Sequence, residues 1–229
     1  MASPIHIISS IATKQLLADL VAQFQQSHSQ EVLVESAGGV DVAKRVQAGE
    51  AFDAIVLAAN VIDKMTESGH IVAGSRVDLA ESGVYVAVRA GATHPDIGSE
   101  DALKQAVLAA RTVGYSTGPS GVYLTQLFER WGIADQIRNR CVQSKPGVPV
   151  GTLIAKGEVE LGFQQLSELM NLPDIDIIGP LPAAVQILTT FSAGVATAST
   201  QADAVRKLLA FMAGADTAEI KRKNGMGPV

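Results

Sequence analysis

Cysteine and long apolar runs are nearly absent from this sequence. Cys141 is the only cysteine among 229 residues, which excludes an internal disulfide and any cysteine-based metal site. We expect Cys141 to be a buried thiol. No apolar run approaches the ~20 residues that a membrane-spanning helix needs, so no membrane insertion is expected.

Basic clusters and leader-like segments are also missing. The net charge is −5 with a pI near 5.4, and no segment gathers the Lys and Arg needed to follow nucleic acid or an anionic membrane. No basic region followed by an apolar stretch precedes the first strand. The expected location is therefore cytoplasmic for the sequence as given, or periplasmic if an export signal has been removed.

Familiar catalytic arrangements are missing as well. There is no Ser/His/Asp arrangement, no metal-ligand cluster and no Walker-type loop, so we expect neither a metal nor a cofactor, and no catalytic residue is identified. The four histidines are scattered, and surface or strand positions suit them better than catalysis.

A strand-then-helix alternation is present instead. Apolar runs at residues 4–8, 32–34 and 53–58 are each followed by a helical pattern. Three such units in a row predict a parallel sheet with right-handed crossovers. Later apolar runs at 83–88 and 184–195 are expected to be strands along which the chain leaves a first domain and returns to it. A final helix is expected to be capped by Thr200.

Residues 115–123 form the most informative loop. They lie between an apolar run and a helical pattern over 124–131. Ser120 is expected to cap that helix, Gly118 and Gly121 would let a ligand approach the backbone, and the helix dipole favours an anion there. The alternative is an ordinary capped turn.

Loops of the same kind recur after four other predicted strands, at residues 9–13, 36–40, 145–151 and 164–167. They are rich in hydroxyl, amide or glycine residues, and helix starts follow most of them. The expected ligand-binding residues are Ser9, Ser10, Ala12, Thr13, Gly38, Gly39, Val40, Ser116, Ser120, Gly121, Val122, Gly147, Val148, Pro149, Gln164 and Gln165.

Three further side chains could meet a carboxylate. Lys44 and Lys145 lie close to the second and fourth loops, although solvated surface charge is the alternative role for each. Tyr123 could donate its phenol, although core packing is the expected role. Gln164 and Gln165 should point to opposite faces of a strand, and of the two Gln165 is expected to face the ligand.

Four segments carry a family resemblance: residues 5–24, 46–53, 118–123 and 157–163. With these motifs in this order, the chain resembles the molybdate-binding-protein-like group of type II periplasmic solute-binding proteins, in a divergent branch near aconitate-isomerase-like members. The resemblance implies an α/β fold of two Rossmann-like lobes with parallel-rich sheets, joined by two crossing hinge strands.

The same resemblance implies the domain organisation. Residues 1–83 with 194–229 would form one lobe and residues 84–193 the other. A ligand cleft would lie between the lobes and close by hinge motion.

The sequence departs from the family where molybdate binders use hydroxyls. By alignment, Ala12 and Gly39 replace serines of the first two loops, and Gln165 replaces a tyrosine. A compact dianion would lack donors there. We therefore predict a small organic anion as ligand, with a di- or tricarboxylate as the expected class.

Three alternatives stay open. The protein could be a carboxylate isomerase of the aconitate type, in which case a positioned base is required that the sequence does not reveal. It could bind molybdate, tungstate or another oxyanion for an ABC transporter, with the permease as partner if it is exported. It could also be a cytoplasmic ligand-sensing domain, although no DNA-binding segment is attached.

Overall fold

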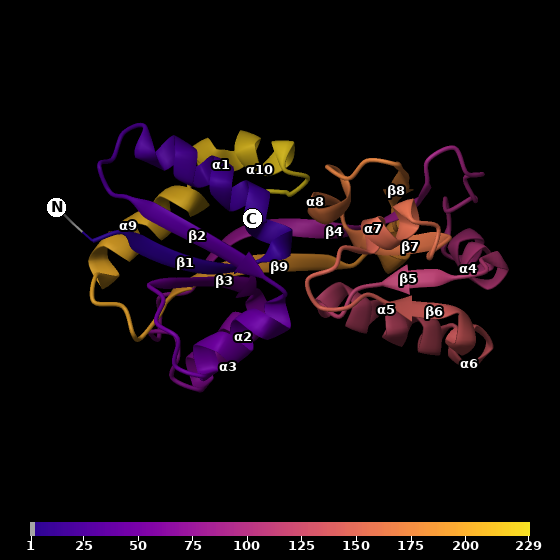
Figure 1. Ribbon diagram of the computed structural model, residues 1–229, viewed down its shortest axis with the longest axis horizontal. Helices are drawn as coiled ribbons and strands as arrows, with labels where there is room; N and C mark the ends of the chain where they lie inside the picture. Colours follow the sequence, from indigo (N-terminus) through magenta and orange to yellow (C-terminus); the bar gives the residue numbers. More distant parts are fainter. Residues whose placement is uncertain (1–2) are drawn as a thin grey trace. The chain divides into compact units, whose positions relative to one another are not determined.

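The computed structural model describes residues 3–229 as two compact units (Figure 1). One unit comprises Met1–Ser82 with Thr189–Val229, and the other comprises Gly83–Leu188. The chain passes between them twice, within strand β4 (Val77–Arg89) and at the start of strand β9 (Leu188–Val195). We call them the first and the second unit.

The first unit is built on a sheet with the order β2-β1-β3-β9. Strand β1 (Ile5–Ser10) pairs in parallel with β2 (Val32–Ala37) and with β3 (Ala54–Ala58), whereas β9 runs antiparallel to β3. The three parallel strand–helix units predicted from the sequence are therefore confirmed.

Helices cover both faces of this sheet (Figure 1). Successive residues of β1 show the division, because Ile7 packs into the core on one face and Ile8 into the core on the other. The helices on the Ile7 face are α1 (Lys14–Gln25), α9 (Ala202–Ala213) and α10 (Ala218–Lys223), and those on the Ile8 face are α2 (Gly39–Gln47) and α3 (Ala59–Glu67).

The second unit is centred on β5 (Val113–Tyr115). Strands β6 (Cys141–Gln143) and β7 (Leu161–Gln165) flank it in parallel. The antiparallel partners are β4, which pairs with β7, and β8 (Ile175–Pro180), which pairs with β4. The sheet order β4-β7-β5-β6 thus mixes a parallel centre with an antiparallel edge.

Helices again lie on both faces, and two separate cores hold them. One face carries α4 (Glu100–Ala109), α5 (Pro119–Arg130) and α6 (Ala134–Ile137), and the other carries α7 (Val150–Ala155) and α8 (Leu166–Leu169). Short 3-10 turns complete the described structure: η1 (Ile11–Thr13), η2 (Arg138–Arg140), η3 (Ala183–Val185) and η4 (Ala215–Thr217).

The predicted α/β class is confirmed, and the strands predicted at 83–88 and 184–195 are present as β4 and β9, but the start of each strand and the cap of α9 differ from the prediction. Strand β4 begins at Val77, because polar side chains of its first half find partners, such as Asp78 with the hydroxyl of Ser192 at 2.6 Å. Residues 183–185 form a 3-10 turn rather than the start of a strand. Helix α9 follows Gln201, not Thr200, and Gln201 makes no side-chain cap because its amide binds the Pro4 carbonyl and Asp53.

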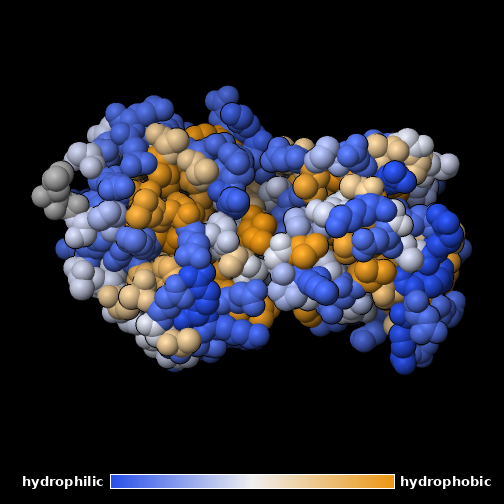
Figure 2. Space-filling view, in the orientation of Figure 1, coloured by the Kyte–Doolittle hydropathy of each residue, from blue (hydrophilic) through white to orange (hydrophobic). Residues whose placement is uncertain are grey.

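The surface is mainly polar on the face shown in Figure 2, where hydrophilic side chains separate small groups of apolar ones. None of the helices within residues 3–229 combines the length and apolar character needed to cross a bilayer. The large apolar side chains that stay exposed are Leu33, Val40, Val122, Tyr123, Met170, Leu188 and Val229.

Candidate functional site

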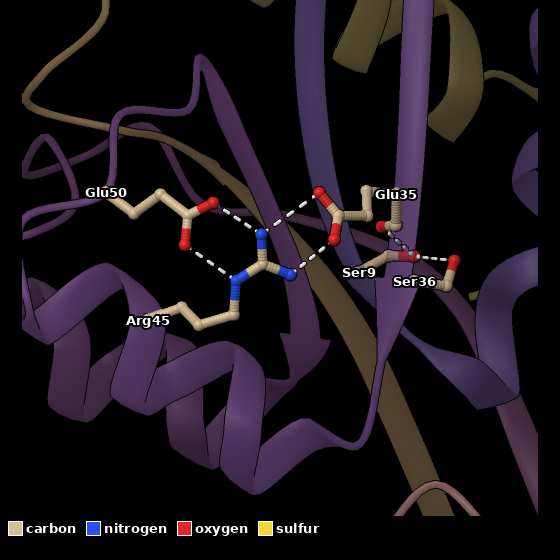
Figure 3. A network of polar contacts seen from close by, with 5 residues as sticks. All are labelled: Ser9, Glu35, Ser36, Arg45 and Glu50. Atoms are coloured by element: carbon tan, nitrogen blue, oxygen red, sulfur yellow. Dashed lines mark hydrogen bonds and ion pairs between the residues drawn. The ribbon is translucent and has the colours of Figure 1, made fainter.

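The strand-end loops of the first unit lie side by side. The register of β1 and β2 pairs Ser10 with Ala37, so the loops that follow the two strands begin at the same sheet edge. The Ser9 hydroxyl is fully buried and lies 2.7 Å from that of Ser36 (Figure 3). Thr13 is also fully buried and donates to the Ser10 carbonyl at 3.0 Å. The hydroxyls of Ser9 and Thr13 therefore form hydrogen bonds within the strand-end loops.

Ser10 differs from these two hydroxyls because it keeps some exposed surface. Its hydroxyl accepts the Ala12 N–H at 3.3 Å and caps the 3-10 turn. A serine hydroxyl has two lone pairs and a proton. Ser10 can therefore bind a further group without giving up this cap, whereas the neighbouring Ala12 side chain is buried.

Gly38 is the N-cap residue of α2 and Gly39 is its first residue. The Gly38 carbonyl accepts the Val42 N–H at 2.9 Å, and neither glycine has a positive φ. A Cβ on Gly39 would make only an ordinary contact, 3.6 Å from Leu57. The backbone geometry therefore does not require glycine at Gly39. Val40 is exposed.

Arg45 sits between two carboxylates at the edge of this loop (Figure 3). Its guanidinium binds Glu35 through two hydrogen bonds and also binds Glu50. These bonds lower the pKa of both carboxyl groups. The Arg45 charge is thus already matched, whereas the exposed Lys44 forms no ion pair within residues 3–229.

In the second unit, the loop after β5 is braced by its own side chains. The Ser116 hydroxyl accepts the Gly118 N–H at 3.3 Å and lies 3.4 Å from the buried Ser120 hydroxyl. The prediction that Ser120 caps the helix is wrong, because α5 begins at Pro119 after an N-cap at Gly118. Proline fits this first position, where no helical N–H bond is needed.

Two other expectations for this loop change. A Cβ on Gly121 would lie 1.8 Å from the Ser116 carbonyl oxygen, so this glycine makes room for the loop and not for a ligand. The expected core packing of Tyr123 is wrong, because Tyr123 and the adjacent Val122 are about half exposed, at 49% and 53%. The Tyr123 phenol is therefore accessible.

The loop after β6 leads into α7. The Val148 N–H donates to the Lys145 carbonyl at 3.0 Å, and Gly147 takes a φ of 79°, which favours glycine. Pro149 is the N-cap residue of α7. The Lys145 side chain is exposed and has no ion-pair partner among the described residues.

The two glutamines that end β7 have different surroundings. The buried Gln164 accepts the Val150 N–H at 2.7 Å and donates to the Glu168 carboxylate at 2.8 Å. It therefore lies on the sheet face covered by α7 and α8. Because strand residues alternate, Gln165 lies on the opposite face with Phe163. That Gln165 is the residue facing the ligand stays a prediction.

Glu168 is the residue that the sequence analysis missed. Burial raises the pKa of its carboxyl to about 7, and the hydrogen bond from Gln164 only partly opposes this effect. No cation pairs with it in the part of the chain that the structure describes. Little in the sequence points to Glu168. It is one acidic residue four positions after Gln164, and the one-turn helix that carries it was not predicted.

No metal site accompanies these groups. Within residues 3–229, no three His, Cys, Asp or Glu side chains are placed to hold an ion. The expectation of a buried Cys141 is wrong, since the residue is half-buried; partial burial still raises the pKa of its thiol. Two of the histidines have structural partners, because His28 stacks on Phe24 and His94 lies 3.2 Å from Asp176.

Comparison with known proteins identifies the family. The model of the bacterial extracellular solute-binding protein family matches residues 5–227. The chain belongs to this family. An aconitate isomerase from Pseudomonas sp. is 39% identical over 189 residues, which cover 82% of this chain and 72% of that protein. The resemblance inferred from the sequence is thus confirmed.

Two solved structures show the same fold at low sequence identity. The periplasmic molybdate-binding protein of Azotobacter vinelandii is 19% identical with a TM-score of 0.79, and the match covers 97% of this chain and 98% of that one. The tungstate ABC transporter structure from Geobacter sulfurreducens is 16% identical with a TM-score of 0.77, over 96% and 98% of the two chains. The fold is therefore that of a periplasmic binding protein.

Proposed function

We propose that this solute-binding protein takes up an unsaturated tricarboxylate of the aconitate type and shifts its double bond. The observation that carries this proposal is the 39% identity with an aconitate isomerase across 82% of the chain. The oxyanion-binding neighbours stand at 16–19% identity, a level at which only the fold is shared.

The ligand class is supported by the donors in the strand-end loops. Three positions that carry hydroxyls in molybdate binders are Ala12, Gly39 and Gln165 in this chain. A compact dianion needs many donors around a small centre, whereas a tricarboxylate spreads its charges over a longer molecule. Separate donor groups such as the Ser10 hydroxyl therefore suit a tricarboxylate better than a compact dianion.

We further propose that strand-end loops supply the ligand-binding groups. The candidates are Ser10 and the glycine pair at Gly38 in the first unit, and the loop at Ser116 and the end of β7 in the second unit. The exposed Lys44 and Lys145 are the candidates for partners of carboxylates, since Arg45 is already bound by Glu35 and Glu50. Backbone N–H groups at the starts of α2 and α5 would add donors.

A thermal-shift screen tests the ligand class. We expect trans-aconitate and cis-aconitate to raise the melting temperature, because a ligand present at 100 times its Kd stabilises by about 2.7 kcal/mol. Molybdate and sulfate at the same concentration should give no shift. A shift with molybdate and none with aconitate would contradict the proposal.

The second candidate function is binding without turnover, as the solute receptor of an ABC transporter. The family description and the tungstate transporter structure favour it. It predicts that trans-aconitate shifts the melting temperature but remains unchanged after long incubation with the protein. Following the formation of cis-aconitate therefore separates the two functions.

A further inference from the structure

We infer that Glu168 is the group that takes and returns the proton when the double bond is shifted. This inference rests on the proposed isomerase function and adds a residue to it. It starts from the one buried carboxyl group near a strand-end loop of the second unit that has no cationic partner in residues 3–229.

The surroundings of Glu168 hold its carboxylate in place through one oxygen. Gln164 donates to Oε1 at 2.8 Å, and Gln164 is itself fixed because its other amide atom accepts the Val150 N–H at 2.7 Å. No described residue donates to Oε2. Glu168 as a residue is half-buried, and part of its surface is exposed.

A second polar group in the same turn also lacks a partner. The Ser167 hydroxyl oxygen is buried and forms no hydrogen bond with any residue in the described part of the chain. Buried polar groups are nearly always paired, and leaving one unpaired is costly. The turn Leu166–Leu169 thus holds a buried hydroxyl without a partner and a carboxylate with one donor among the described residues. A polar ligand would complete the hydrogen bonds of both groups.

The protonation behaviour of Glu168 suits the role. Burial raises the pKa of its carboxyl to about 7, and the only opposing effect is the Gln164 hydrogen bond. No charged group on β7, α7, α8 or any other described element contributes to this shift. A general base works best when its pKa lies near the operating pH, because both protonation states are then available during one turnover.

The chemistry balances with this single residue. The Glu168 carboxylate removes a proton from the methylene carbon next to a carboxylate of the substrate, and the freed electron pair forms a new C=C bond. The old π bond breaks toward the far carbon, which takes the proton back from the Glu168 carboxyl. Neither an oxidant nor a reductant is needed, and Glu168 ends the turnover as it began.

The test compares Glu168→Gln with Glu158→Gln in the full chain, using trans-aconitate as the probe. Glu158 is an exposed glutamate of the same unit, so it controls for the loss of one carboxylate. We expect E168Q to lose about 100-fold or more in kcat, while its melting-temperature shift with trans-aconitate stays as in the wild type. E158Q should match the wild type in both measurements.

Each other result has a distinct meaning. If the wild type and E168Q convert trans-aconitate at similar rates, the role of Glu168 is overturned and the proposed function stands. If the wild type binds but does not convert it, both are overturned.

A measurement on the wild type alone covers the case in which E168Q does not fold. We expect kcat to rise with pH to a plateau, with a midpoint near the pKa of about 7. A rate that does not change between about pH 5.5 and 8.5 would overturn the role.

Discussion

In both units, polar side chains hold the loops that follow the parallel strands, but the two units use different kinds of side chain. In the first unit, the loops after the parallel strands are held by small hydroxyls that bind each other or the backbone, as Ser9 binds Ser36. In the second unit, the loops are held by Gln164, which joins the start of α7 to the Glu168 carboxylate. The hydroxyl groups in the first unit are uncharged and have hydrogen-bond partners. The second unit instead contains the Glu168 carboxyl group, whose pKa is raised to about 7.

Under the proposed function, this contrast assigns ligand binding and proton transfer to different groups. Satisfied hydroxyls and turns position donors but cannot accept a proton near neutral pH, because serine hydroxyls do not titrate in that range. A buried carboxyl can accept one. Under the proposed isomerase function, we therefore assign proton transfer to the second unit, and substitutions made in one unit at a time test this assignment.

The largest effect is expected from Gln164→Ala. This change removes a buried side chain and leaves the Val150 N–H without its acceptor. We expect a loss of about 3 kcal/mol in the free energy of unfolding, measured with denaturant. The exposed Gln105→Ala is the matched control and should change it by less than about 0.5 kcal/mol. Equal effects of the two changes would refute the bridging role of Gln164.

Glu168→Gln should stabilise the protein, and the effect should depend on pH. The folded pKa of about 7 lies above the value of 4.5 for a free carboxyl, so the wild type loses stability as pH rises from about 4.5 to 7. The neutral glutamine avoids this loss. We expect E168Q and wild type to be equal near pH 4, and E168Q to be about 2–3 kcal/mol more stable at pH 8. A difference that is constant with pH would argue against a buried, titrating Glu168.

In the first unit, the Asp53 carboxylate accepts three hydrogen bonds. Burial favours a raised pKa, but hydrogen bonds from the His6 N–H, the Ser199 hydroxyl and the Gln201 amide outweigh it and lower the pKa. The stability that Asp53 contributes is therefore present above its unfolded pKa of 3.8 and lost as pH falls.

Asp53→Asn should accordingly cost about 1–2 kcal/mol at pH 7 and less at pH 3. Urea unfolding at the two pH values measures this difference. The exposed Asp216→Asn serves as control and should show little effect at either pH. A cost that grows on acidification would contradict the assignment.

The smallest effect is expected from Arg45→Gln. Arg45, Glu35 and Glu50 form an exposed network (Figure 3), and salt screens such pairs. We expect a slight loss of thermal stability that vanishes in high salt, with unchanged affinity for trans-aconitate. Lys44→Gln, by contrast, should weaken trans-aconitate binding. Weakened binding in the Arg45 variant and not in the Lys44 variant would reverse our assignment of the two cations.

Much of the fold follows from local sequence pattern. Periodic apolar residues such as Leu16, Leu20 and Phe24 of α1 are buried as predicted, because one face of an amphipathic helix has few alternatives to the core. The first half of β4 was missed for the opposite reason. Its polar residues are stabilised by partners distant in sequence, such as Ser192 for Asp78.

The candidate site was less predictable than the fold. Small residues correctly marked the loops, but their roles depend on contacts that the sequence does not show: Gly121 makes room for the Ser116 carbonyl, and Ser120 is not a cap. Glu168 escaped notice because its raised pKa arises from burial in the folded unit. A carboxylate looks the same in sequence whether it is solvated or buried.

The most direct test of the proposed isomerase is to incubate the protein with trans-aconitate in D2O and follow the mixture by proton NMR. If the protein is the proposed isomerase, signals of cis-aconitate grow until the two isomers reach equilibrium, with deuterium entering the exchanging carbon positions. Unchanged trans-aconitate in the presence of saturating protein would contradict it, and would leave a binding protein without this chemistry.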